Sequence, residues 1–305
     1  MLIVLMIVYF THINAVDYRG EMRRLIQSIA DTATAKNSSF IIIPQNAAAL
    51  LYRSDSGFIQ EFSMKISAIG HEPLFSGMSN KVIANDVAVL KSIHQSGLPV
   101  WIIDYAATHA EAKRYIKRAR EQSFIPFTAS SRMLDTIPEH SKKLFKWNDN
   151  DCTTLADVQN FLYIINPQHY KTIDAFADAI RSTDFDAVVV DAFFGSLPLD
   201  PDTVKSLKKK HSGKRRLVLA YMSIGEAEDY RYYWKKEWHM TNPSWIVDEN
   251  SRWKGNYRVK YWNQTWHDIV YAQKGSYLDI ILENGFDGVY LDVVDAFMRF
   301  ETEGI

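Results

Sequence analysis

The chain has 305 residues, of which 47% are hydrophobic and 23% are charged, a composition typical of a globular protein. Basic and acidic residues nearly balance, at 35 against 36, and the net charge of −1 excludes a broad electrostatic attraction to nucleic acid or to an anionic membrane. A single cysteine, Cys152, excludes an internal disulfide and any metal site built from cysteines. The one basic cluster, within residues 205–216, is interpreted as the solvated end of a helix.

The first ten residues, MLIVLMIVYF, are almost wholly apolar. This run is too short for a stable membrane span, which takes about 20 apolar residues. It resembles the hydrophobic part of a secretory signal, although no basic residue precedes it. Two alternatives stay open. Residues 1–15 are either a signal peptide or anchor of a secreted or cell-envelope protein, or a buried segment of a cytoplasmic one.

Eight short apolar runs alternate with amphipathic segments along the rest of the chain. The runs are residues 40–44, 66–71, 100–104, 124–128, 161–166, 187–191, 217–223 and 288–292. Continuous apolar runs are typical of parallel strands buried on both faces. The helical segments between them include residues 110–122, 173–181, 203–210 and 277–284. The alternation predicts an α/β fold, and the count of eight favours one (β/α)8 TIM barrel over residues 16–305, with residues 138–160 as a linker.

Acidic residues follow these strands with unusual regularity. The carboxyl ends of the strands carry the active site in such barrels. The polar side chains expected to meet there are Asn46, Glu72, Asp104, Asp191, Glu226 and Asp292. Carboxylates held together raise one another's pKa, which suits them to proton transfer or to binding cationic groups. Histidine is too sparse at these ends to predict a metal site. No glycine-rich phosphate loop follows a strand, so no nucleotide cofactor is expected.

Aromatic residues gather in one stretch, between Tyr230 and Trp266. It holds six of the eight tryptophans of the chain, and asparagines are interleaved with the rings. Rings can cover the apolar faces of sugars while amides bind their hydroxyls, so at least two of these rings are expected to contact a carbohydrate. The alternative is an insertion that packs its own small core.

Several segments are recognisable as those of a known family. YMSIGEAEDYRYYW (221–234), VKYWNQTW (259–266) and GFDGVYLDVVDAF (285–297) resemble the endo-α-1,4-polygalactosaminidases, glycoside hydrolase family 114, and their uncharacterised bacterial and archaeal relatives. FIIIPQN (40–46) and AIGHEPLF (68–75) resemble later strands of that family but come first here. The order indicates a circular permutation, in which residues 40–44 pair beside residues 288–292. The other explanation is a fragment that spans two tandem copies.

The resemblance implies an endo-acting hydrolase of an α-1,4-linked, galactosamine-type polysaccharide. It places the catalytic aspartate on Asp292 and the catalytic glutamate on Glu72. By analogy with other barrels that carry acids on their fourth and sixth strands, we expect a retaining mechanism with Asp292 as nucleophile and Glu72 as acid/base. Asp295, past the strand end, is expected to brace a loop. The substrate contacts expected around the pair are Asn46, Asp104, Asp191, Tyr221, Glu226 and Trp262.

One departure from the family leaves other functions open. Lys254, Gly255 and Asn256 precede YRVKYW, where the family carries a Gly-Glu pair. This difference favours, as the main alternative, a catalytically silent barrel that binds a polysaccharide or oligosaccharide without cleaving it. A metal-dependent polysaccharide deacetylase or hydrolase is the third hypothesis.

Overall fold

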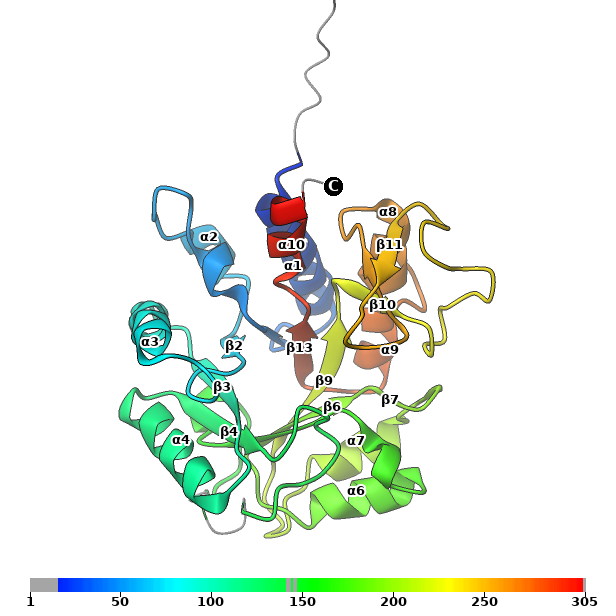
Figure 1. Cartoon of the computed structure of the whole chain (residues 1–305). Helices are drawn as coiled ribbons and strands as arrows, with labels where there is room; N and C mark the ends of the chain where they lie inside the picture. Colours follow the sequence, from blue (N-terminus) through cyan, green and yellow to red (C-terminus); the bar gives the residue numbers. More distant parts are fainter. Residues whose placement is uncertain (1–15, 141–143, 145–146, 304–305) are drawn as a thin grey trace, which may run out of the picture.

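The structure is a computed structural model that describes residues 16–140, 144 and 147–303. The expectation of a signal or anchor in residues 1–15 lies outside the described residues. The fold is a mixed α/β structure with parallel sheets (Figure 1). No helix among the described residues is both long and apolar enough to cross a membrane.

All eight predicted strands are present, and they form two parallel sheets. The larger sheet has the order β1 (Ile41–Pro44), β13 (Gly288–Asp292), β9 (Leu217–Ser223), β6 (Ala187–Asp191) and β5 (Phe161–Ile164). The smaller sheet has the order β2 (Ile69–His71), β3 (Val100–Tyr105) and β4 (Ile125–Ala129). β1 pairs with β13 in parallel, with Ile41 opposite Gly288, which confirms the predicted pairing of two strands from opposite parts of the sequence.

The two sheets are neighbours at both ends. Beside β1 and β2, the Asn46 amide donates to the Gly70 carbonyl at 2.8 Å, and the Ser67 amide donates to the Ile42 carbonyl at 2.8 Å. At the other end β4 contacts β5. The strands are almost completely buried, as their continuous apolar sequences predict.

Helices lie on the outside of the strands (Figure 1). They are α1 (Tyr18–Lys36), α2 (Gln60–Ser63), α3 (Asn80–Gln95), α4 (His109–Glu121), α6 (Ile173–Arg181), α7 (Pro201–Leu207), α8 (Gln264–His267), α9 (Tyr277–Glu283) and α10 (Ala296–Glu303). Local sequence sets their starts: Thr108 and Glu111 form a capping box before α4. The helix predicted from residue 203 begins earlier, at Pro201, because Asp200 caps it. α1 packs against α10, and Arg19 binds Glu301 at 2.8 Å.

The aromatic stretch forms a small antiparallel sheet beside the strand ends. Its order is β10 (Glu226–Glu228), β12 (Asn256–Val259) and β11 (Ile246–Glu249). A short hairpin of β7 (Phe193–Phe194) and β8 (Leu197–Pro198) lies nearby. Ring contacts join Trp238 to Trp245 and Trp245 to Trp266, so many of these rings pack on one another, as the insertion with its own core predicts.

The interpretation of residues 205–216 as a solvated helix end is wrong for two residues. Lys210 is 2% exposed and Arg216 is completely buried, beneath the amino ends of β6 and β9. The ammonium of Lys210 lies 2.6 Å from Asp186 and also donates to the Asn148 carbonyl at 2.9 Å. These bonds hold the segment predicted as a linker against the sheet, and Cys152 is buried beside them. Burial raises the pKa of its thiol to about 11.

Candidate active site

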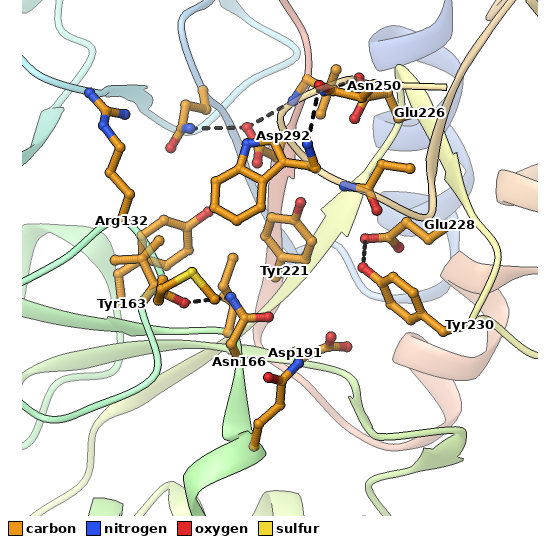
Figure 2. Close-up of a pocket in the computed structure, with 18 of the residues that line it drawn as sticks. Arg132, Tyr163, Asn166, Asp191, Tyr221, Glu226, Glu228, Tyr230, Asn250 and Asp292 are labelled. Carbon is orange, nitrogen blue, oxygen red and sulfur yellow. Dashed lines mark hydrogen bonds between the residues drawn. The ribbon is translucent and has the colours of Figure 1, made fainter. Parts of the chain in front are cut away.

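A pocket of about 1230 Å³ opens at the carboxyl ends of the parallel strands. Each strand end contributes to its lining, through Asn46 after β1, Glu72 after β2 and Asp292 on β13, among others. The segment between β11 and β12, residues 250–255, and strand β10 add a wall. Figure 2 shows Asp292 and Tyr221 in the middle of the pocket, with Arg132 on one side and Glu228 and Tyr230 on the other.

The two predicted catalytic carboxylates are bridged by one amide. The side-chain nitrogen of Gln45 donates to Glu72 Oε2 at 2.8 Å and to Asp292 Oδ1 at 3.0 Å. Those two oxygens are therefore at most 5.8 Å apart, the sum of the two distances. Residues from β1, β2 and β13 meet here, and the pairing of β1 with β13 makes this possible.

The second oxygen of Glu72 is held from two sides. The Tyr105 hydroxyl donates to Oε1 at 2.7 Å, and Arg132 donates to the same oxygen at 2.7 Å. Arg132 also lies over the ring of Tyr105, with its guanidinium carbon 4.5 Å from the ring centre. The Glu72 side chain thus has a fixed position and a cation beside it, but the Arg132 side chain is 58% exposed and can be displaced.

Asp292 lies in a less polar environment. Burial raises the pKa of its carboxyl to about 7, and the charge of Glu72 adds to the shift. Oδ1 accepts a hydrogen bond from the backbone amide of Val293 at 2.8 Å, and Tyr221 donates to the carboxylate. Val293 has a φ of 57°, a strained conformation for a β-branched residue that turns the chain sharply after β13. The pair therefore holds a proton close to neutral pH.

A second pair of carboxylates lies in the same pocket. Asn250 donates to Glu226 at 2.8 Å, and Asn46 donates to Asp295 at 3.2 Å. Burial raises the pKa of both carboxyls. The bond from Asn46 agrees with the expectation that Asp295 braces a loop, although Asp295 also lines the pocket.

Arg231 ties two further acids together. Its guanidinium binds both oxygens of Asp191, at 2.8 and 2.9 Å, and Glu228 at 2.5 Å. The Arg231 side chain is 1% exposed, and it also lies over the rings of Phe193 and Tyr230. The three charged groups form a fixed network in the pocket wall, in which the Asp191 carboxylate already has a bidentate partner.

Six of the eight predicted site residues line this pocket: Asn46, Glu72, Asp191, Tyr221, Glu226 and Asp292. Two do not, and their placement does not fit a substrate contact here. Asp104 is 1% exposed and accepts the backbone amides of Phe75 and Ser76, so it fixes the chain after β2 from below. Trp262 packs against Tyr18 and Phe300, where the helices α1 and α10 meet.

Sequence reasoning did not single out several residues of the pocket. They are Gln45, Tyr105, Arg132, Tyr163 and Glu228. Gln45 had a signal, because it stands one place before Asn46 at the same strand end. Arg132 follows the end of β4 in an irregular segment, and its sequence indicates no role. Of the aromatic stretch, Tyr230 and Trp253 line the pocket.

No group of three or more histidine, cysteine, aspartate or glutamate side chains within residues 16–140, 144 and 147–303 has the geometry to hold a metal ion. The pocket holds two carboxylates bridged at short distance and has aromatic rings on its wall. Such a site is of the kind that glycoside hydrolases use.

Comparison with known proteins agrees with this class. The model of glycoside hydrolase family GH114 matches residues 146–305, just over half of the chain. The chain belongs to this family.

Three relatives are uncharacterized proteins. That of Methanocaldococcus jannaschii is 41% identical over 136 residues, which are 44% of this chain and 38% of its own length. That of Thermotoga maritima is 33% identical over 159 residues, or 51% of this chain and 47% of its length. That of Deinococcus radiodurans is 37% identical over 127 residues, or 41% and 38%. The matched part of this chain spans less than half the length of each of these relatives.

Proposed function

We propose that this protein hydrolyses an α-1,4-linked, galactosamine-type polysaccharide within the chain, with Asp292 and Glu72 as its two catalytic carboxylates. Membership of the GH114 family supports the reaction class. The observation that carries the proposal is the bridge from Gln45 to both carboxylates, which keeps their nearest bound oxygens within 5.8 Å. Retaining glycosidases hold their carboxyl groups about 5–5.5 Å apart, and inverting ones about 6.5–9.5 Å. The short separation favours retention.

In the proposed mechanism Asp292 attacks the anomeric carbon as a carboxylate while Glu72 gives its proton to the leaving glycosidic oxygen. The glycosyl ester on Asp292 is then hydrolysed, as Glu72 takes a proton from the attacking water and Asp292 leaves as a carboxylate. One proton shared by the pair is therefore required for each turnover. The pKa of about 7 on Asp292 indicates that the free pair carries this proton on Asp292 near neutral pH, so the proposed roles require the proton to move to Glu72 when the substrate binds.

The charges of the pocket support an amino sugar as the substrate. Among the described residues, Glu226 and Asp295 have no lysine or arginine at ion-pair distance, whereas Glu72, Asp191 and Glu228 each have an arginine partner. Burial raises the pKa of Glu226 and Asp295, and a substrate ammonium group would offset the cost of their ionisation. Tyr230 is 49% exposed and Trp253 is 40% exposed, so both rings are accessible to a sugar face.

We also propose that the two sheets are parts of one (β/α)8 barrel, permuted relative to its family. The contacts of β1 with β2 and of β4 with β5 support closure, and the pairing of β1 with β13 supports the permuted order. A rearranged chain, with residues 16–145 placed after residues 146–303, tests this. It should fold with the same thermal stability to within a few degrees. Failure to fold, in versions with different linkers at the new junction, would contradict the permutation.

The substrate class is tested with α-1,4-galactosamine oligosaccharides of defined length, alongside their fully N-acetylated counterparts. We expect internal cleavage of the free amino sugars, seen by mass spectrometry, and much slower cleavage of the acetylated ones, which lack the positive charge. Activity should survive a chelator. Tight binding with no cleavage by the wild-type protein would instead support the silent carbohydrate-binding barrel, and loss of activity with a chelator would support the metal-dependent enzyme.

A further inference from the structure

Four tyrosines from four strands gather beneath the catalytic carboxylates: Tyr105 on β3, Tyr163 on β5, Tyr221 on β9 and Tyr290 on β13. Two of their hydroxyls have partners in the pair, since Tyr105 donates to Glu72 and Tyr221 to Asp292. The hydroxyls of Tyr163 and Tyr290 are buried and have no hydrogen-bond partner among the described residues. Tyr163 is 1% exposed and Tyr290 is completely buried.

A buried hydroxyl without a partner costs about 1–3 kcal/mol, and one that borders a pocket can recover that free energy from a molecule bound there. Packing does not require the hydroxyl of Tyr163. Its ring lies 5.1 Å from the ring of Tyr290 and 6.4 Å from that of Tyr221, contacts that a phenylalanine ring would make equally well. The hydroxyl therefore points to a ligand rather than to the fold.

The surroundings of the two unpartnered hydroxyls differ. Tyr163 lines the pocket, whereas Tyr290 does not. The Tyr290 hydroxyl lies against the backbone of β2, so close that a Cβ atom added to Gly70 would be 1.8 Å from it. Gly70 on β2 leaves room for that hydroxyl, and neither Gly70 nor Tyr290 lines the pocket. Of the two tyrosines, only Tyr163 borders the space that a molecule entering from the solvent would occupy.

The Tyr163 hydroxyl also lies close enough to both carboxylates to feel their charges. Burial, with the negative charges of Asp292 and Glu72, raises its pKa well above the usual value of 10. It therefore keeps its proton at any pH at which the protein would work and is a permanent hydrogen-bond donor. Figure 2 shows Tyr163 on the same side of the pocket as Arg132, across from Glu228 and Tyr230.

We propose that the Tyr163 hydroxyl donates a hydrogen bond to the sugar unit that lies between Asp292 and Glu72, at a polar group next to its anomeric carbon. The two carboxylates flank the anomeric carbon in the proposed mechanism, so a pocket-lining donor near both of them contacts the same sugar unit. Tyr163 is then a substrate-contact residue. This inference rests on the proposed glycosidase function and names the residue that completes its central subsite.

The test compares Tyr163→Phe with the matched variant Tyr290→Phe. Each change removes one buried, unpartnered hydroxyl, and the two rings are in contact. We expect Tyr163→Phe to lower kcat/KM on galactosamine oligosaccharides about tenfold or more, because one substrate hydrogen bond is lost. Its Tm should be unchanged or higher. Tyr290→Phe should keep kcat/KM within about twofold. Full activity of Tyr163→Phe, or an equal loss in Tyr290→Phe, would overturn the inference.

A crystal of the Asp292→Asn variant with bound galactosamine separates this inference from the proposed function. A sugar within hydrogen-bond distance of the Tyr163 hydroxyl supports the inference even when the wild-type protein cleaves nothing, and the silent barrel then replaces the enzyme. A sugar that occupies the pocket without contacting Tyr163 overturns the inference even when the wild-type protein is active. An empty pocket at saturating sugar, confirmed by absence of binding in calorimetry, contradicts both.

Discussion

The raised pKa of Asp292 means that ionisation of its carboxyl destabilises the folded protein, so Asp292→Asn should increase stability. Asparagine preserves the local bonds. Both donors to the carboxylate at known distance, Gln45 and Val293, bind the single oxygen Oδ1. The amide oxygen of asparagine can replace that atom, and the Tyr221 hydroxyl, which donates to the carboxylate, can accept from the amide nitrogen as well as donate.

The magnitude follows from the pKa difference. The carboxyl titrates near 3.8 in its ordinary environment and near 7 in the folded protein, so the folded state binds the proton more tightly. The stabilisation by that proton is complete below pH 4 and is lost as the pH rises through 7. Each pKa unit corresponds to about 1.4 kcal/mol, so the wild-type protein loses about 4 kcal/mol relative to the variant. A change of about 1 kcal/mol shifts the Tm of a chain of this size by about 2 °C. The Tm difference between Asp292→Asn and the wild-type protein should therefore grow by about 8 °C from low to high pH.

Thermal unfolding of both proteins, followed by circular dichroism from pH 4 to pH 8.5, measures this difference. The wild-type Tm should fall relative to that of Asp292→Asn between pH 4 and pH 7, and the difference should be constant above pH 8. A Tm difference that does not change with pH would refute the reasoning, because the ionisation of Asp292 would then have no effect on stability. A variant that is less stable than the wild type at pH 8 would refute it as well.

Three further outcomes follow from the same contacts. First, kcat/KM should fall as the pH rises through about 7, because the carboxylate pair then loses its last proton, and a rate that stays level to pH 9 would contradict this. Second, azide should rescue Asp292→Ala with a glycosyl azide of inverted configuration and Glu72→Ala with one of retained configuration; NMR of the products reports an exchange of the two roles if the configurations are reversed. Third, Lys210→Met should lower the free energy of unfolding by about 3–5 kcal/mol in urea, because the buried charge of Asp186 loses its partner. Asp186→Asn combined with Lys210→Met should recover part of that loss, and no recovery would show that the ion pair is not the cause.

Strand positions were predictable because each strand is a continuous apolar run bounded by turn residues. The strands β6, β9 and β13 begin and end where the sequence predicts. β5 ends at Ile164 rather than at residue 166, because Asn166 starts the short helix Pro167–His169. The order of the strands came from the family resemblance, since no local pattern tells which distant strands pair.

The site was partly predictable for the same reason. Asp292 and Glu72 end strands, and strand ends converge at one edge. The residues that set their chemistry are harder to find, because Gln45 and Arg132 act through side-chain geometry that no periodicity encodes. Asp104 was misplaced because a strand-end acid satisfies backbone amides as readily as it contacts a substrate. Trp262 was misplaced because an aromatic-rich stretch does not reveal which rings face inward.

The central claim is that Asp292 and Glu72 are the catalytic pair. The most direct measurement is the initial rate of galactosamine-oligosaccharide cleavage by Asp292→Asn, Glu72→Gln and the matched control Asp295→Asn, another half-buried pocket carboxyl. The account predicts a loss of at least about 10²–10⁴-fold in the first two, with folding and sugar binding retained, and a far smaller loss in the third. Full activity of Asp292→Asn or of Glu72→Gln, or a complete loss in Asp295→Asn alone, would contradict it.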